Sequence, residues 1–350
     1  MTTVARTAAR GRRRAVLAGQ ALLVILLVLA LLSMSVGRLG LSPGEVLAAL
    51  TGNGPVRDQK VITGLRLPRT LTAVLVGAGL AISGALMQSL TRNALGSPDF
   101  VGITAGATTG ALLAIIGGGS AMADVSLGAF AGGMGTALVI YLLVFRRGLH
   151  GFRLVLVGIG VSAMLFAFND FLISRASIYD ALAAQAWRTG SLNLRDWEHV
   201  LIMGGALVLL LPVALYHARR LSLLEMHDEV AAGLGVPVHR TRLLLLLVSV
   251  ALAAVATALT GPIAFVALAA PHLARRLAGA SGPGIVPSAL MGAVLLVVGD
   301  VMVQQFFPGT QLPVGIATGS IGGLYLIWLL GGEWLRRKAS GWVSARRTVG

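Results

Sequence analysis

The segment Thr70–Leu90 reads TLTAVLVGAGLAISGALMQSL and contains no charged side chain. At a rise of about 1.5 Å per residue, about 20 apolar residues in a helix cross a hydrocarbon core roughly 30 Å thick. Three glycines, Gly77, Gly79 and Gly84, lie within the segment. Because no hydrophobic force drives helices together in lipid, small residues that allow close backbone approach indicate a helix packed against neighbours. The segment therefore predicts a membrane-spanning helix inside a bundle.

Segments of the same kind recur along the whole chain. Of its 350 residues, 56% are hydrophobic and 12% are charged, against about 25% charged in a typical soluble domain. The segment Ala264–Ala278 is short and contains Pro271 and His272, which fits a half-length or tilted helix. The other predicted spans are Ala15–Val36, Val101–Gly117, Ala121–Phe145, Arg153–Ile173, Val200–Tyr216, Leu243–Thr260, Ile285–Gln305 and Pro313–Glu333. These segments predict an all-α, polytopic membrane protein with ten transmembrane helices, one of them short.

The positions of the basic residues predict the orientation of this bundle. With ten spans and a cytosolic N-terminus, 20 of the 28 Lys and Arg residues fall on the cytosolic side, as the positive-inside rule expects. Nine spans would place the Arg-rich C-terminal end outside. We therefore predict a basic cytosolic tail at residues 1–14, a single transmembrane domain at 15–335 and a second basic cytosolic tail at 336–350. The polar stretch 218–242 then forms the longest internal cytosolic loop, between the sixth span and the seventh.

The composition also excludes several classes of function. The net charge is +15, but the arginines cluster at the ends of apolar runs and form no continuous stripe, which argues against nucleic-acid binding. Cysteine is absent, so disulfides, thiolate metal sites and a cysteine nucleophile are excluded. The sequence contains no Walker motif and no His-Glu-x-x-His run, which argues against an ATPase and a zinc protease. We expect neither catalytic residues nor a cofactor bound by this chain.

Few ionisable side chains fall inside the predicted spans. An ion-coupled carrier needs such groups near mid-membrane, although each costs about 2.5–3.5 kcal/mol at a helix centre. Asp170 lies near the outer end of the fifth span and Asp300 in the outer half of the ninth. Two carboxylates are few for a proton relay across the membrane. For Asp300 we favour a structural role, in which another group in the protein caps or pairs with the carboxylate. An ion-coupled secondary transporter stays the alternative from a different class.

Four stretches, in order along the chain, resemble the FecCD/BtuC-type permeases of ABC importers, which take up iron-siderophores, heme or vitamin B12. The resemblance covers roughly residues 40–335. The stretches are Arg66–Ala107, which begins RLPRTLTAVLVGAGL; Ala186–Trp197, AWRTGSLNLRDW; the run from GLGVPVHRTR at Gly233 to GPIAFVALAAPHLARRLAG ending at Gly279; and Gln311–Leu330, QLPVGIATGSIGGLYLIWLL. The runs SLLEMHDEVAAGLGV and QQFFPGTQLPVG most resemble the branch that serves catecholate siderophores of the enterobactin type.

This resemblance implies a type II ABC-importer permease in the bacterial cytoplasmic (inner) membrane. It implies a second permease subunit as partner, with a heterodimer favoured over two copies of one chain. Two cytosolic ATPase subunits would use ATP and Mg, and an extracytoplasmic binding protein would deliver the ferric siderophore. A heme or vitamin B12 importer of the same architecture stays the alternative within transport.

The cytosolic loop would couple the permease to its ATPase. The resemblance implies that Ser222–Arg242 forms two short helices, joined at Gly235, which fit a cleft of the ATPase. A glycine can end a helix in the left-handed conformation because it has no Cβ. The candidate coupling residues are Glu225, Asp228, Glu229, Leu234, Gly235, Arg240 and Arg242.

Two further sets of residues follow from the resemblance. Arg66 and Arg69 match an arginine pair that meets glutamates of the binding protein, a role that suits the planar fork of a guanidinium. Gln304 stands where a vitamin B12-type permease has a third docking arginine. The fifth span would line the translocation path, with candidates Ser162, Met164 and Phe168.

Overall fold

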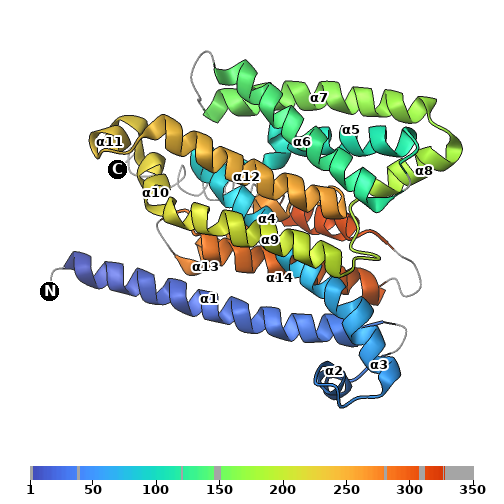
Figure 1. Ribbon diagram of the computed structural model, residues 1–350. Coiled ribbons are helices and arrows are strands. Elements are labelled where there is room, and N and C mark those ends of the chain that lie inside the picture. The colour runs from blue at the N-terminus through green and yellow to red at the C-terminus, as the bar shows by residue number, and fades with distance from the viewer. Residues whose placement is uncertain are drawn as a thin grey trace, which may run out of the picture.

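The computed structural model describes residues 3–37, 40–119, 121–145, 151–279, 282–306, 312–325 and 327, and of residues 3–12, 100, 101, 145, 151 and 152 only the backbone. Within these ranges every regular element is helical, which confirms the predicted all-α class. Figure 1 shows most of the long helices running side by side in one bundle. The predicted tail at 336–350 and the end of the last predicted span lie outside the described residues.

The helices of the bundle agree closely with the predicted spans. Among the described residues, seven helices are long and apolar enough to cross a membrane, and two further apolar helices, Ile103–Ile116 and Val314–Tyr325, are shorter. With the 13-residue α13, each predicted span contains a helix. The protein is therefore polytopic, whereas the count of ten crossings and the side of the termini stay predictions. The α-helices are α1 (Thr3–Ser35), α2 (Pro43–Leu50), α3 (Val56–Val61), α4 (Leu67–Thr91), α5 (Ile103–Ile116), α6 (Met122–Phe145), α7 (Gly151–Arg175), α8 (Ile178–Trp187), α9 (Trp197–Tyr216), α10 (Ala218–Met226), α11 (Asp228–Gly233), α12 (Val238–Thr260), α13 (Val266–Ala278) and α14 (Ile285–Phe306).

α4 begins earlier than the predicted Thr70 and continues outward without a break. A π-helical turn, Ile62–Arg66, joins it to α3, so one helical path runs over Val56–Thr91. Pro68 lacks an N–H, and its ring crowds the carbonyl four residues earlier, which would break a regular α-helix. A wider π turn just before the proline accommodates that crowding. The arginines on either side of Pro68 therefore stand on a continuous helix.

α4 is the centre of the bundle, where it packs against α9, α12, α13 and α14. Its glycines allow backbone contact with these neighbours, as the sequence predicts. A Cβ on Gly77 would lie 2.4 Å from the carbonyl oxygen of Gly292, and one on Gly84 would lie 1.7 Å from that of Ala267. Any larger residue at either position would force α14 or α13 away from α4.

A reciprocal pair of serines joins α4 to α12 in the middle of the bundle. Ser83 Oγ donates to the carbonyl oxygen of Ser249 at 2.7 Å, and Ser249 Oγ donates to that of Ser83 at 2.9 Å. Both side chains are fully buried. Each hydroxyl thus satisfies a buried polar group that has no access to water.

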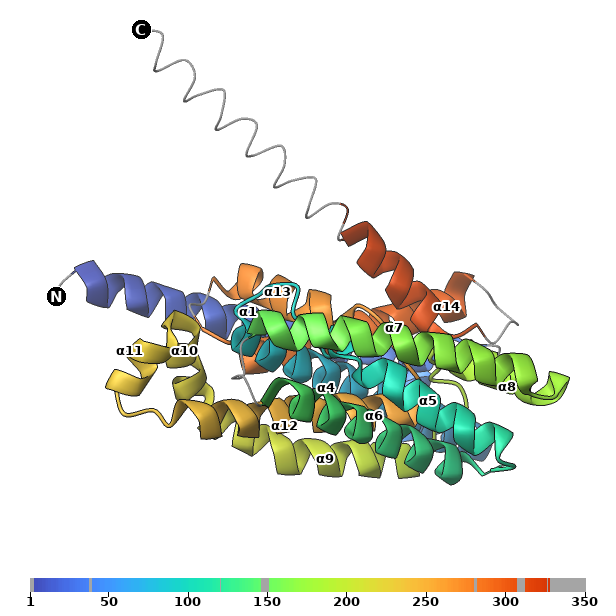
Figure 2. The same ribbon diagram turned by 90° about the horizontal axis from the view of Figure 1, so that it is seen from above.

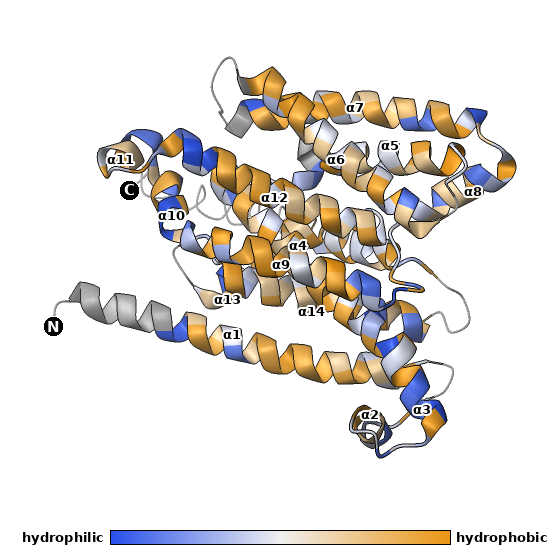
Figure 3. Cartoon of the chain, viewed as in Figure 1, coloured by the Kyte–Doolittle hydropathy of each residue, from blue (hydrophilic) through white to orange (hydrophobic). Residues whose placement is uncertain are grey.

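α1 and α7 lie on opposite sides of the bundle in Figure 1, while in Figure 2 α9 and α14 lie on opposite sides of α4. Of the most hydrophobic stretch of α7, only 17% of the residues are buried. In the helix that includes α4 the corresponding share is 78%. Figure 3 shows that these outer helices are predominantly hydrophobic. Their exposed apolar faces suit lipid or another membrane subunit.

Polar residues collect at the two ends of the bundle (Figure 3). α10 and α11 lie at the same end as the start of α1, and α2, α3 and α8 lie at the other end (Figure 1). At the first end, Arg14 Nε donates to the carbonyl oxygen of Leu277 at 3.1 Å, in the last turn of α13. We call this the inner end and the opposite one the outer end, following the predicted orientation.

Candidate functional site

The predicted coupling loop forms a compact element at the inner end. It contains two short helices, α10 and α11, as predicted, but they join at His227 and not at Gly235. His227 is extended, with φ −172° and ψ 155°. The acidic Asp228 and Glu229 occupy the first turn of α11, where carboxylates favour the partial positive charge of a helix start. This preference places the boundary between the two helices before Asp228.

Gly235 instead ends α11 and turns the chain toward α12. Its φ is +79°, so the predicted left-handed conformation is confirmed. Gly235 N donates to the carbonyl oxygen of Ala232 at 2.9 Å, and Val236 N donates to that of Ala231 at 3.0 Å, as in a Schellman-type C-terminus. Arg240 and Arg242 then belong to the first turns of the long helix α12, not to a second short helix.

Asp228 holds the coupling element against the bundle. Its carboxylate accepts hydrogen bonds from Arg242 Nη1 at 3.1 Å and Nη2 at 2.9 Å. It also pairs with Arg92, the left-handed C-cap of α4. Arg92 Nε in turn donates to the carbonyl oxygen of Leu224 on α10 at 2.8 Å. We call Arg92, Asp228 and Arg242 the inner triad; it connects α4, the coupling element and α12.

The two arginines keep Asp228 ionised. Burial on its own raises the pKa of this carboxyl, but the hydrogen bonds and charges of Arg242, and then those of Arg92, outweigh it, so the pKa of Asp228 lies below its ordinary value. The predictions from sequence included Asp228 and Arg242 but missed Arg92. Arg92 is 136 residues away from Asp228 in the chain, and no local pattern relates the two.

Four of the five remaining candidate coupling residues are exposed, and the fifth, Glu225, acts electrostatically on Arg275 of α13. Glu229, Leu234, Gly235 and Arg240 are exposed, and Glu225 is half-buried. The element also exposes Met226 and Val230, which the sequence reading did not single out. A small core of Leu224, Ala231 and Val236 packs beneath them. The loop therefore has an inner side fixed to α4 and α12 and an outer side free to meet a partner.

At the outer end, two of the three predicted docking residues meet at one buried carboxylate. Asp300 on α14 has no exposed side-chain surface. Arg69 Nη2 lies 2.7 Å from its Oδ1, and Nε lies 3.1 Å from its Oδ2. Gln304 Nε2 donates to the same Oδ2 at 2.8 Å. This outer triad of Arg69, Asp300 and Gln304 joins α4 to α14, and the pairing expected for Asp300 is observed.

Arg66 lies apart from the outer triad. Its Nη1 donates to the carbonyl oxygens of Met34 at 2.6 Å and Ser35 at 3.3 Å, in the last turn of α1. A guanidinium there satisfies carbonyls that have no partner within their own helix and complements the negative end of the helix dipole. Arg66 and Arg69 therefore hold different helices at the outer end, Arg66 the end of α1 and Arg69 α14.

The three predicted path residues do not share a face of α7. Ser162 is buried, and its Oγ donates to the carbonyl oxygen of Gly158 at 2.7 Å. Met164 and Phe168 are 68% and 41% exposed. At about 100° per residue, Met164 lies about 200° around the helix from Ser162. Met164 and Phe168 could line a path together, whereas Ser162 faces the interior of this chain.

Two further contacts, one polar and one aromatic, were not predicted from the sequence. Asn169 is fully buried on α7, and it accepts a hydrogen bond from Thr109 Oγ1 on α5 at 2.7 Å. The ring of His272 on α13 lies edge-on to that of Tyr325, with centroids 6.1 Å apart. Both contacts join helices within the bundle, and the hydrogen bond to Thr109 satisfies the buried amide of Asn169.

Comparisons with known proteins agree with this arrangement. Residues 25–331 match the FecCD transport family. The chain is 48% identical over 294 residues to the ferric enterobactin transport system permease protein FepG of Escherichia coli, covering 84% of this chain and 89% of the relative. It is 39% identical over 320 residues to the achromobactin transport system permease protein CbrC of Dickeya dadantii, covering 89% and 91%.

A solved structure supports the same assignment. It is an inward-facing ABC transporter of metal-chelate type, with a TM-score of 0.80 and 29% identity, and the match covers 90% of this chain and 99% of that one. The long helices, the polar inner element and the sequence match over most of the chain thus lead to one conclusion. The chain is a member of the FecCD transport family.

Proposed function

We propose that this chain is the transmembrane permease subunit of an ATP-driven importer that moves a ferric catecholate siderophore across the bacterial cytoplasmic (inner) membrane. The observation that carries the proposal is the 48% identity to the ferric enterobactin permease of Escherichia coli over most of both chains. The achromobactin permease adds a second relative named for siderophore transport. The chain itself supplies the path and has no ATPase site, catalytic residue or bound cofactor of its own.

The working assembly requires several partners. A second permease subunit, in a heterodimer, would cover the exposed face of α7 and complete a path lined by Met164 and Phe168. Two ATPase subunits would bind at the inner end and use ATP and Mg. A binding protein outside would deliver the chelate, and lipid would cover the remaining apolar surface. Nucleic acid is not a partner.

Coupling to the ATPase would pass through the inner triad. The exposed residues Glu229, Leu234 and Arg240 offer charged and apolar contacts to a cytosolic partner. When the ATPase closes and displaces this element, Asp228 would transmit the force to α4 through Arg92 and to α12 through Arg242. Since α4 lies at the centre of the bundle, a small displacement there reaches several helices at once.

Docking of the binding protein would use the outer end. Asp300 engages Nε and Nη2 of Arg69, so Nη1 is the nitrogen through which a partner carboxylate would bind. Arg66 would contribute a second guanidinium from the end of α1, and Gln304 a neutral contact. Reversing the charges at Arg66 and Arg69 together should weaken binding-protein docking, measured as a dissociation constant.

The proposed function is tested by uptake in proteoliposomes that contain the complete assembly. Radiolabelled ferric enterobactin should enter only when the ATPase subunits, ATP and Mg are present together with the binding protein. Uptake of heme or vitamin B12 in place of the siderophore would show that the chain belongs to an importer of that other substrate. Uptake driven by an ion gradient without the ATPase would contradict the proposal.

A further inference from the structure

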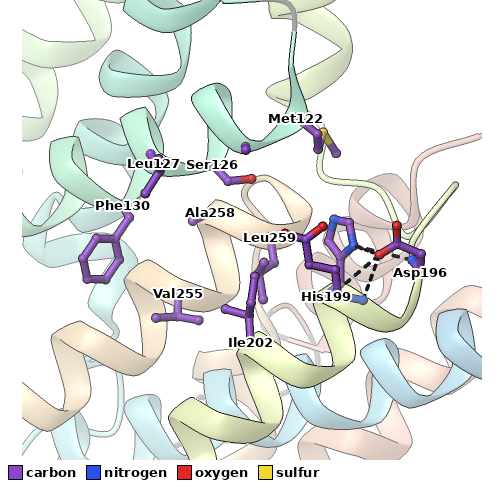
Figure 4. A pocket seen from close by; sticks show the side chains of 12 residues that line it. Met122, Ser126, Leu127, Phe130, Asp196, His199, Ile202, Val255, Ala258 and Leu259 are labelled. Carbon is purple, nitrogen blue, oxygen red and sulfur yellow. Dashed lines mark hydrogen bonds and ion pairs between the residues drawn. The ribbon is translucent and has the colours of Figure 1, made fainter.

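A groove opens on the flank of the bundle between α6 and α9. Both helices pack against α12, and in the part of the chain that the structure describes they have no extensive contact with each other. The groove has a volume of about 470 Å³, within the range of about 300–1,000 Å³ typical of small-molecule sites. Figure 4 shows Val255 and Ala258 of α12 at its base, with Leu127 and Phe130 of α6 on one side and Ile202 of α9 on the other.

The groove lies toward the outer end of the bundle. Its residues come from the first turns of α6 and α9 and from the last turns of α12. Leu127 is 68% exposed and Ile202 is 46% exposed, so the groove opens sideways on an apolar surface. In a membrane this surface meets the hydrocarbon chains and headgroups of the outer leaflet. An occupant therefore needs an apolar body and a polar end.

The polar end of the groove is acidic. Asp196 and Glu198, at the start of α9, line it, and the side chain of Asp196 is 62% exposed. Asp196 Oδ1 lies 2.7 Å from Nδ1 of His199 (Figure 4). The hydrogen bond from His199 is the main reason that the pKa of Asp196 lies below its ordinary value. The carboxylate is therefore charged at neutral pH.

Arg195, which precedes Asp196 in the chain, does not line the groove. Arg195 is only 6% exposed, its Nη1 lies 3.1 Å from His199 Nε2, and its Nε donates to the carbonyl oxygen of Ser191 at 3.3 Å. Asp124, in the first turn of α6, adds another exposed carboxylate at this end. The charge presented to an occupant is therefore negative.

We propose that this groove binds a phospholipid with a primary ammonium headgroup, of the phosphatidylethanolamine class. One acyl chain lies along the apolar walls, and the ammonium group lies between Asp196 and Glu198. An ammonium group offers three N–H donors, which the two carboxylates can accept. Anionic lipids bind basic pockets, so an acidic one disfavours them. The same charge disfavours a ferric catecholate chelate, which is anionic.

Lipid binding to the full-length purified chain, measured by native mass spectrometry, tests the inference. Phosphatidylethanolamine, phosphatidylglycerol and phosphatidylcholine are titrated separately. We expect about fivefold more phosphatidylethanolamine than phosphatidylglycerol to be retained, as two partly exposed ion pairs would give. Phosphatidylcholine, whose ammonium has no N–H, should fall between them. The double variant D196N/E198Q should bind the three lipids equally, and Asn at position 196 still caps α9.

Two further variants separate the groove from general effects. Ala123 is exposed and lines the groove, so A123W should fill it and lower retention of all three lipids. V208W places the same ring on the lipid-facing side of α9 away from the groove and should change nothing. D58N/D180N removes two acids of the outer end from α3 and α8 and serves as the charge control.

Four results would overturn the inference. One is equal retention of phosphatidylethanolamine and phosphatidylglycerol by the unmodified chain. Another is unchanged selectivity in D196N/E198Q, and a third is unchanged retention in A123W. Displacement of the bound lipid by a ferric siderophore would assign the groove to the cargo instead. None of these outcomes affects the result of the ATP-driven uptake test, so the two proposals are tested independently.

Discussion

At each end of α4 an arginine pairs with an aspartate from a distant part of the sequence. At the outer end, Arg69 binds Asp300, whose side chain is completely enclosed. At the inner end, Arg92 binds Asp228, whose side chain is 43% exposed. The outer triad joins two long helices, whereas the inner triad joins two long helices to a pair of short ones. The same kind of ion pair therefore occurs in two different environments on one helix.

The difference in burial determines what each triad can do. Breaking a buried ion pair leaves a charge without water or partner, which costs about 3–5 kcal/mol. A partly exposed pair can separate and be hydrated, and typical exposed pairs contribute only about 0–1 kcal/mol. The outer triad thus fixes α4 to α14, while the inner triad can break and form again. This asymmetry suits a subunit that receives its motion at the inner end.

The largest expected effect comes from removing Arg69. The variant R69M leaves Asp300 buried without its main partner, and Gln304 cannot neutralise the charge. We expect a loss of about 3–5 kcal/mol in the free energy of unfolding, measured by denaturant unfolding of the purified chain in detergent micelles. Replacing both partners, as in R69M/D300L, should recover much of this loss because no unpaired charge stays behind.

Equal stability of R69M and the unmodified chain would show that the outer triad is not the rigid end of α4. The double variant R69M/D300L separates the docking role of Arg69 from its structural role. If this variant is stable but no longer docks the binding protein, Arg69 contributes to docking directly. The proteoliposome assay with and without the binding protein provides that measurement.

The next effect concerns coupling through Asp228. The variant D228N leaves Arg92 and Arg242 facing each other without a negative charge between them. We expect a loss of about 1 kcal/mol in stability, together with a severalfold fall in siderophore taken up per ATP hydrolysed. D228E keeps the charge on a longer side chain and should retain more uptake per ATP than D228N does.

Acid provides a second measurement of the same contact. Because the folded pKa of Asp228 is lowered, its stabilising contribution is present above the unfolded pKa of about 3.9 and is lost as pH falls through the lower folded value. D228N should abolish that part of the acid sensitivity. Unchanged uptake per ATP in D228N would contradict the role of the inner triad in coupling.

A pair of glycines gives a matched comparison at the inner end that concerns stability alone. A Cβ on either Gly233 or Gly235 would meet no atom within 4 Å, so any effect of alanine comes from the backbone. Gly235 has φ +79°, where a side chain costs about 1–2 kcal/mol, whereas Gly233 is helical, where alanine gains up to about 1 kcal/mol. G235A should therefore lower the melting temperature and G233A should raise it. A fall of similar size in both would contradict this account.

Composition and local pattern predicted most of the fold. Runs of about 20 apolar residues, the glycines of α4 and the left-handed turn at Gly235 depend on short stretches of sequence. The triads depend on which helices lie side by side, and Arg69 and Asp300 are 231 residues apart. The predicted junction at Gly235 follows from the family resemblance, whereas the local preference of Asp228 and Glu229 for a helix start favours the observed boundary at His227. Helical spacing alone, by contrast, could have separated Ser162 from Met164.

The smallest expected effect lies midway between the two ends of α4, at the serine pair. Ser83 and Ser249 each donate to the other's carbonyl oxygen, so each hydroxyl depends on the alignment of α4 with α12. A double-mutant cycle with S83A, S249A and both together should give a coupling energy of about 0.6 kcal/mol, typical of hydrogen bonds between membrane helices.

The same serine cycle, measured in the complete assembly with and without ATP, reports where α4 moves. If α4 moves as a rigid helix held at its outer end, the serines must shift relative to α12 when the inner triad is displaced, and the coupling energy should fall in the ATP-bound state. An unchanged coupling energy would mean that α4 and α12 move together, since the contact between them would be the same in both states. In that case α4 and α12 would move as one unit, and the outer triad would be the point about which this unit moves.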